Sequence, residues 1–307
     1  MKLIRSNVNS ISKADIVLIG LPDESKSHAK RKGASRGPDY IRSASDEYEY
    51  FERDGKLIPI SPMTGDLQSK KIFDFGNVDR EDLYRLVFDV ATASKIPLVL
   101  GGDHSITTLS LNAVSDALGA KLSLLYFDAH PDFVTSTRDY YGSVLSDSID
   151  YVDFSRSLLI GTRGAEPEEL LNIQANNLKT ISPLDILERG VRGISKQILS
   201  RCGQDSSLYI SIDLDCIDPG IAPGVSVPTP GGITPLELIF LVKKACEQCN
   251  VVGLDIVELT PDFDLNNNTA NIAARTLMES MASMKIRQER HGTTRTGPVD
   301  DDTRTGR

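Results

Sequence analysis

Short apolar runs recur along the chain, and nearly every one ends in glycine or a polar residue. Six of them are DIVLIGLP (15–22), KIPLVLGGDH (95–104), LSLLYFDAH (122–130), SLLIGTRG (157–164), LYISIDLD (208–215) and VVGLDIVE (251–258). Runs that are apolar at consecutive positions are typical of the inner strands of a parallel sheet, which are buried on both faces. The pattern therefore predicts six core strands.

Helical patterns lie between these runs, at 81–95, 106–118 and 234–249. Strands that alternate with helices indicate βαβ units, in which helices cover both faces of a mostly parallel sheet. We find no internal repeat and no linker, so we expect a single domain over 1–290 with a three-layer α/β/α fold. The last residues, HGTTRTGPVDDDTRTGR (291–307), are polar and lack apolar periodicity, which predicts a flexible tail or a remnant of cloning.

The composition of the 307 residues is that of a soluble globular protein, with 40% hydrophobic and 25% charged residues. No apolar stretch approaches the roughly 20 residues of a membrane span. The first residues, MKLIRSNVNSISKAD, lack the apolar core of a signal peptide. We therefore expect a cytoplasmic protein with no membrane partner.

The net charge of −9 argues against a nucleic-acid partner, because proteins that bind the phosphate backbone usually present a basic face. A cationic small molecule suits this surface better. Four cysteines in a chain of this length do not indicate a disulfide framework. Cys246 and Cys249 form a CxxC, but it falls inside a helical pattern without a second pair, so we interpret both as ordinary helix cysteines.

Acids and histidines gather where three of the predicted strands end. They are Asp103 and His104 in GGDHS, Asp128, His130 and Asp132 in FDAHPD, and Asp213 and Asp215 in SIDLDCIDP. On a strand, every second residue points to the same side, so the members of each motif can converge. Ligands of parallel sheets bind beyond the carboxyl ends of the strands, which is where these motifs lie.

Four carboxylates at one buried centre would carry a charge of about −4, and such a cluster needs cations nearby. Two divalent ions would balance that charge. Hard oxygen donors with one imidazole per ion favour Mn²⁺ over zinc, while Ni²⁺, Co²⁺ and Fe²⁺ also fit this ligand type. The alternative interpretation is that each acid caps a helix or lies in a surface loop, but three such motifs at three strand ends favour the metal site.

The motifs also resemble those of the ureohydrolase family, the arginases, agmatinases and their relatives. Five ordered blocks carry the resemblance: GLPDESKSHAKRKGASRGPDYIR (20–42), GGDHSIT (101–107), FDAHPD (127–132), SIDLDCIDPGIAPGVSVPTPGG (211–232) and GLDIVELTPDFD (253–264). The resemblance implies an arginase-like fold and hydrolysis of a guanidino compound to urea and an amine. It also implies assembly as a homotrimer or homohexamer.

The resemblance assigns a role to each ligand residue. One ion would be bound by His104 and Asp132, the other by His130 and Asp215, and Asp128 and Asp213 would bridge the pair. Glu258 stands where the family has a carboxylate that holds the guanidinium group of the substrate. Asp103 could either hydrogen-bond a ligand or stabilise its turn.

The chain departs from the family after FDAHPD, where most relatives have a His-Gly pair that shuttles a proton to the leaving amine. Tyr141 precedes Gly142 here, and only four histidines exist. His28, in the early loop, could substitute, and Tyr141 could donate a proton although its ordinary pKa of about 10 makes it a poor shuttle. Loss of a general acid typically slows catalysis by about 10²–10⁴-fold, so this departure concerns the activity and not the predicted metal site.

The block ending PDFD (261–264) and the GGDHS motif resemble those of agmatinases, so we expect agmatine as the substrate. Guanidinobutyrate and arginine are alternatives, and Arg138 could favour a substrate with a carboxylate. A related group of deacetylases requires adjacent histidines, which this chain lacks. A further alternative is a metal-binding subunit without catalytic activity.

Overall fold

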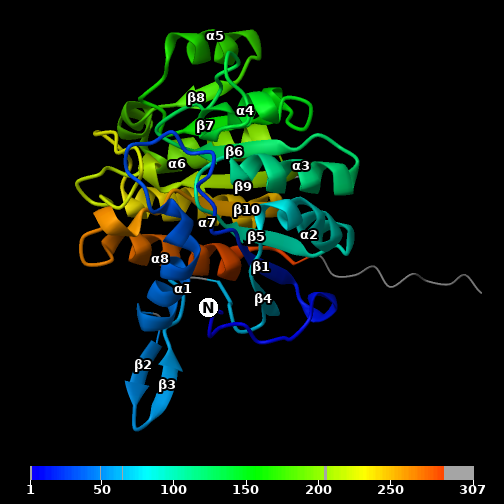
Figure 1. Cartoon of the computed structure of the whole chain (residues 1–307), viewed down its shortest axis with the longest axis vertical. Coiled ribbons are helices and arrows are strands. Elements are labelled where there is room, and N and C mark those ends of the chain that lie inside the picture. The colour runs from blue at the N-terminus through cyan, green and yellow to red at the C-terminus, as the bar shows by residue number, and fades with distance from the viewer. Residues whose placement is uncertain (1, 49, 64, 204–205, 287–307) are drawn as a thin grey trace, which may run out of the picture.

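A sheet of eight strands forms the centre of the protein (Figure 1), in the order β4-β1-β5-β10-β9-β6-β7-β8. The strands are β1 (Ile16–Gly20), β4 (Ile72–Asn77), β5 (Ile96–Leu100), β6 (Ser123–Phe127), β7 (Leu158–Ile160), β8 (Lys179–Ile181), β9 (Ser207–Asp213) and β10 (Asn250–Val257). Every neighbouring pair in this sheet is parallel. All six predicted strands are confirmed, whereas β4 and β8 were not identified from the sequence.

The computed structural model describes residues 2–48, 50–63, 65–203 and 206–286. The predicted tail at 291–307, including His291, lies outside these residues. Within them, no helix is long and apolar enough to cross a membrane.

Helices cover both faces of the sheet, which confirms the predicted three-layer arrangement. They are α1 (Gly37–Tyr48), α2 (Arg80–Thr92), α3 (Ile106–Leu118), α4 (Val144–Asp147), α5 (Pro167–Ala175), α6 (Pro183–Cys202), α7 (Pro235–Gln248) and α8 (Asn268–Ser283). One layer contains α1, α6, α7 and α8, and the other contains α2 and α3. α7 begins with a capping box, in which Thr234 and Glu237 satisfy each other's backbone N–H groups.

The core consists of two apolar layers, one on each face of the sheet. Alternate residues of a strand enter opposite layers, so Leu98 and Leu100 pack on one side of β5 and Val99 on the other. The two-sided burial explains why the strands are continuous apolar runs. The antiparallel hairpin of β2 (Tyr50–Arg53) and β3 (Lys56–Pro59) projects away from this core.

Strand order brings the chemical motifs together. β5, β10, β9 and β6 are neighbours in the sheet, although their order along the chain is different. An early loop, residues 21–36, crosses the carboxyl ends of these strands. It packs so closely there that a Cβ atom on Gly102 would lie 1.9 Å from the carbonyl oxygen of Asp23. The GGDHS motif therefore needs glycine at this position.

Candidate metal centre

Four neighbouring strands each deliver a polar residue to one buried centre. His104 follows β5, Asp128 follows β6, Asp213 ends β9 and Glu258 follows β10. All four residues are at most 3% exposed. Asp132 and Glu258 have backbone φ angles of +50° and +68°, in the left-handed region that non-glycine residues rarely adopt. Strain of this kind persists where the surrounding structure fixes the conformation, as it often does at functional sites.

The convergence of Asp128, His130 and Asp132 does not arise from strand alternation, and this part of the sequence prediction was wrong. β6 ends at Phe127, so all three residues belong to the loop that follows the strand. Likewise, Asp215 lies in a short 3-10 helix beyond β9. The loops, not the pleat of the sheet, bring these side chains together.

In each of three aspartates, one carboxylate oxygen accepts a backbone hydrogen bond and the other oxygen points to the centre. The Oδ1 atom of Asp128 accepts from the N–H of His130 at 2.6 Å, and that of Asp213 accepts from the N–H of Asp215 at 2.7 Å. The Oδ1 atom of Asp215 accepts from the N–H of Ala129 at 3.0 Å. The backbone thereby fixes each carboxylate and leaves its Oδ2 atom for the centre.

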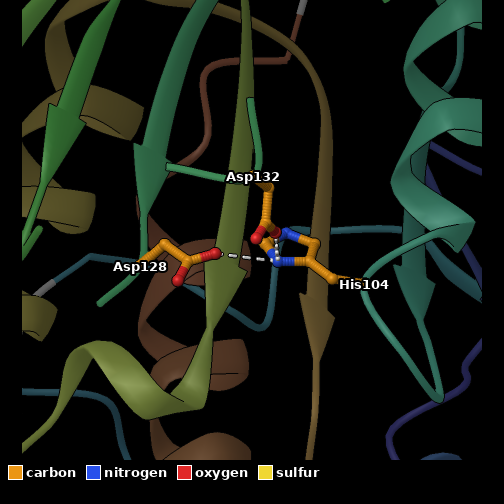
Figure 2. Close-up of side chains that lie close together, drawn as sticks. All are labelled: His104, Asp128 and Asp132. Carbon is orange, nitrogen blue, oxygen red and sulfur yellow. Dashed lines mark ion pairs between the residues drawn. The ribbon is translucent and has the colours of Figure 1, made fainter. Parts of the chain in front are cut away.

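These Oδ2 atoms surround two imidazole nitrogens. His104 Nδ1 lies 2.9 Å from Asp128 Oδ2, 3.1 Å from Asp132 Oδ2 and 3.2 Å from Asp213 Oδ2. Figure 2 shows His104, Asp128 and Asp132 pointing toward one another. His130 Nδ1 lies 3.0 Å from Asp215 Oδ2 and 3.5 Å from Asp128 Oδ1. Potential ligand atoms thus form two groups that share Asp128.

The buried aspartates of this cluster repel one another, so a nearby positive charge would stabilise their ionised forms. Burial, followed by the nearby Asp132 and Asp215, raises the pKa of Asp128 to about 7. Burial and the same kind of repulsion hold the pKa of Asp213 well above its ordinary value. Burial alone would lower the pKa of His130, but the adjacent Asp215 and Asp128 outweigh it and raise the pKa to about 12.

The donors therefore fit divalent cations. Within the part of the chain that the structure describes, Asp128 Oδ2 is buried and makes no hydrogen bond, although His104 Nδ1 lies 2.9 Å away. Four carboxylates and two imidazoles surround the centre with hard oxygen and nitrogen donors. A pair of cations would occupy the space into which these atoms point.

Two residues that support the centre were missed by the sequence analysis. The ring of Tyr126 stacks on His104 with centroids 4.7 Å apart, and its hydroxyl donates to Asp132 Oδ2 at 2.7 Å. Ser211 Oγ lies 2.9 Å from His104 Nε2 and donates to Asp255 at 2.6 Å. Tyr126 lies two positions before Asp128, and Ser211 lies two positions before Asp213. Because alternate residues of a strand point to the same side, this spacing could have indicated both residues from the sequence.

Arg163 was also missed, because no local motif marks it. Its guanidinium group donates to the carbonyl oxygens of Asp215 at 2.8 Å, Gly161 at 3.0 Å and Pro230 at 3.1 Å. It therefore ties the loop after β7 to the loops that follow β9. Only the fold brings these segments together.

Glu258 lies beside the cluster with one oxygen fixed and one unpartnered. Its Oε1 atom accepts from the backbone N–H of His104 at 2.8 Å. Its buried Oε2 atom has no hydrogen-bond partner among the described residues. Burial, and then the charge of Asp103, raises the pKa of Glu258 to about 8. A buried carboxylate of this kind is suited to a cationic ligand.

The remaining predicted site residues lie on two loops near the centre. Tyr141 is edge-on to His28, with ring centroids 6.1 Å apart. Burial, followed by the charges of Asp132 and Glu258, raises the pKa of Tyr141. Arg138 points elsewhere, since its guanidinium group donates to the carboxylate of Asp147 and to the carbonyl oxygen of Ser146 at 2.7 Å.

Known proteins that match this chain include a guanidino acid hydrolase and agmatinases, which fits the geometry of the centre. A model of the Arginase family matches residues 14–283. The chain is 30% identical to the mitochondrial guanidino acid hydrolase of Homo sapiens, over 88% of this chain and 78% of that protein. It is 29% identical to the agmatinase of Citrobacter koseri, over 88% of this chain and 87% of that protein.

Solved structures agree with this relationship. The agmatine ureohydrolase of Thermoplasma volcanium superposes with a TM-score of 0.75 at 29% identity, over 92% of this chain and 93% of that chain. The match of both sequence and fold spans nearly all of the described residues. The chain therefore belongs to the arginase family.

Proposed function

We propose that this protein is a binuclear-metal ureohydrolase that converts agmatine to putrescine and urea. The observation that carries the proposal is the surplus of buried carboxylate around His104 and His130, which fits two cations. Relatives named agmatinase support the substrate. Relatives named guanidino acid hydrolase and proclavaminate amidinohydrolase make guanidinobutyrate or another guanidino compound, including arginine, the alternatives.

The proposed ligand assignment is the one that the resemblance to the family implies. His104 and Asp132 would hold one ion, His130 and Asp215 would hold the other, and Asp128 and Asp213 would be shared by both. The short approaches of Asp128 to both imidazoles support its bridging role. Mn²⁺ is the proposed metal because oxygen donors predominate, with Ni²⁺, Co²⁺ or Fe²⁺ as substitutes.

The ions would supply the positive charge that lowers the pKa of water toward neutrality and so provides a nucleophile. Glu258 orients the substrate. Its Oε1 atom is held by the backbone of His104, and its buried Oε2 atom has no hydrogen-bond partner among the described residues. A planar guanidinium group that binds this carboxylate is fixed in orientation beside the ligand cluster.

The leaving amine must gain a proton, and we propose that two neighbouring residues provide it. Tyr141 keeps its proton at neutral pH, because burial and nearby acids raise its pKa. His28 lies against Tyr141 and carries an imidazole, the side chain that enzymes most often use to transfer protons. We assign the proton transfer to this pair. Changing either to alanine should lower kcat by on the order of 10²-fold and alter the pH profile.

Urea release by the manganese-loaded protein tests the function. The substrates are agmatine, arginine, guanidinobutyrate and guanidinopropionate, and the control is Asp128→Asn. Turnover that the control loses supports the proposal. Silence with every substrate, in a sample that holds two ions per chain, would instead support a metal-binding subunit without catalytic activity.

The remaining proposals concern the state of the protein in the cell. We propose a cytoplasmic homotrimer or homohexamer with a catalytic domain over 1–290. Light scattering would measure the mass of the assembly, and a monomer in solution would contradict this part of the proposal.

A further inference from the structure

A large hollow lies at the amino ends of β4, β1, β5 and β10, and we call it the amino-end hollow. Its volume is about 1570 Å³, and residues that precede or begin these strands line it, among them Asp15, Ile96 and Val251. His104 and Glu258 follow the carboxyl ends of β5 and β10. The length of these strands therefore separates the hollow from the metal centre.

The charge of the amino-end hollow is opposite to that of the whole chain. The protein has a net charge of −9. The described residues that line the hollow include one acid, Asp15, and four lysines, which are Lys13, Lys71, Lys95 and Lys285. Four lysines against one aspartate give the lining a net charge of +3. Positive charge is thus concentrated in a cavity of an acidic protein, which favours an anionic ligand.

The sheet fixes two of the lysines on either side of Asp15. The backbone N–H of Asp15 donates to the carbonyl oxygen of Lys71 at 2.7 Å, and its own carbonyl oxygen accepts from Ile96, the residue after Lys95, at 3.0 Å. Lys71 and Lys95 therefore lie on the two neighbouring strands, with backbones about 10 Å apart. The carboxylate of Asp15 accepts from the backbone N–H of Lys71 at 2.9 Å, so this acid already has a partner.

Three of the lysines are accessible to a ligand. Lys13, Lys71 and Lys285 are exposed. Within the part of the chain that the structure describes, none of these three forms an ion pair. Lys13 Nζ contacts only a neutral group there, the amide oxygen of Asn9 at 3.4 Å. Like charges around one cavity repel one another, and a bound anion would remove this repulsion.

The type of cation and the apolar wall indicate the class of anion. Lysine binds phosphate as a compact point charge, whereas recognition of a planar carboxylate favours the fork of an arginine, which the described lining lacks. The volume is sufficient for a cofactor-sized molecule. Ile96, Leu118 and Ile286 are half-buried and add apolar surface to the lining. A molecule with several phosphates and an apolar part matches both features.

We propose that the amino-end hollow is a second ligand site, which binds the phosphate chain of a small organic polyphosphate such as a nucleoside triphosphate. The four lysines hold the phosphates, and the apolar wall contacts the organic part. The inference goes beyond the proposed function and does not depend on it, because the two sites lie at opposite ends of the strands. Inorganic polyphosphate has the same charge chemistry, so the test must separate the two sources.

Isothermal titration calorimetry of the metal-free, full-length protein tests the site, with adenosine triphosphate and inorganic tripolyphosphate as probes. Both should bind, and added salt should weaken the binding because it screens the exposed lysines. Adenosine triphosphate should bind more tightly, since its adenosine group can contact the apolar wall. Tripolyphosphate that binds as tightly would overturn the assignment to an organic molecule. Absence of binding at about 1 mM of either probe would overturn the whole inference.

Charge-removing variants locate the binding. Lys71→Gln/Lys285→Gln should raise the Kd of both probes by about three- to thirtyfold, because two charge contacts are lost. Lys71→Arg/Lys285→Arg keeps the charge and should keep most of the affinity. Lys56→Gln/Lys196→Gln is the matched control, since both lysines are exposed and lie on β3 and α6. Equal losses in the control would mean that only the overall charge matters and would overturn the inference.

The metal centre provides the last comparison. Metal-free Asp128→Asn should bind adenosine triphosphate with the same Kd as the metal-free wild type. Binding that appears only after loading with manganese would place the probe on the ions and overturn the inference. Neither measurement requires urea release, so loss of the proposed function and loss of the second site are distinguishable results.

Discussion

Asp74 and Asp128 are buried carboxylates in two different regions of this protein, and the two regions balance the charge in different ways. Asp74 on β4 receives a two-pronged contact from Arg42 on α1, at 2.8 Å and 3.0 Å. Its two oxygens also accept from the backbone N–H groups of Leu3 and Gly76. Around Asp128, carboxylates outnumber the nearby imidazoles, and Asp128 Oδ2 makes no hydrogen bond among the described residues, although His104 Nδ1 lies 2.9 Å away.

The difference separates a structural carboxylate from a ligand-binding one. A buried charge that only supports the fold carries its partner on the same chain, as Asp74 does. A cluster that repels itself is maintained because something outside the chain completes it. Removal of one charged group should therefore have opposite effects on stability and activity in the two regions.

The largest effect should come from Asp128→Asn. Loss of the proposed bridging ligand should lower kcat/KM for the accepted substrate by roughly a thousandfold or more, because the ions contribute several kcal/mol to the barrier. After chelation, however, the variant should unfold at the same or a higher temperature than the chelated wild type, since one repelling charge is gone. A chelated variant that melts several degrees lower would contradict the charge-surplus interpretation.

The opposite pattern is expected for Arg42→Met. Removing the guanidinium group leaves Asp74 buried without its partner and should lower the free energy of unfolding by about 3–5 kcal/mol. Activity per folded molecule should change little, because the pair lies outside the metal centre. Urea denaturation and urea-release assays measure the two quantities. The double variant Arg42→Met/Asp74→Leu should recover much of the lost stability, and failure to do so would mean that the pair itself is not the cause.

A third prediction concerns the pH dependence of the chelated protein. The folded-state pKa of Asp128 is raised from 3.8 to about 7, so the folded state holds its proton more tightly than the unfolded state. Protonation of Asp128 therefore stabilises the folded, chelated protein fully at low pH, and this contribution to the free energy of unfolding is lost as the pH rises through about 7. Calorimetry should show the melting temperature of the chelated protein falling by several degrees between about pH 5 and about pH 8. An equal fall in the manganese-loaded protein would show that other groups are responsible.

The smallest effect should come from Tyr126→Phe, which removes the hydroxyl that donates to Asp132 but keeps the ring on His104. Partners of this kind orient metal ligands, and their loss typically weakens metal binding by about 10–100-fold. Titration of the metal-free protein with Mn²⁺ measures the change. Tyr209→Phe, which removes a buried hydroxyl that donates to Asp255, is a matched substitution farther from the ligands and should change manganese affinity less.

Much of the fold was predictable because burial on both faces leaves a continuous apolar run at each inner strand. The edge strands β4 and β8 were missed. β4 alternates between buried and exposed residues, and β8 has three residues of which only one is buried, so neither contains such a run. The ligand residues were predictable because acids and histidines follow core strands in short motifs. The four lysines of the amino-end hollow carry no such signal, since each could as well be an ordinary surface lysine.

The sequence by itself determined which residues are chemically unusual: acids and histidines placed after apolar runs, where burial is expensive without a cation. Tertiary structure alone decided how they meet, because the order β5-β10-β9-β6 places segments that are distant in the chain side by side. It also decided the partners of Arg138 and Asp74, and the gathering of four lysines around the amino-end hollow. Contacts between distant segments depend on which strands are neighbours and how the loops close over them, and local patterns contain neither.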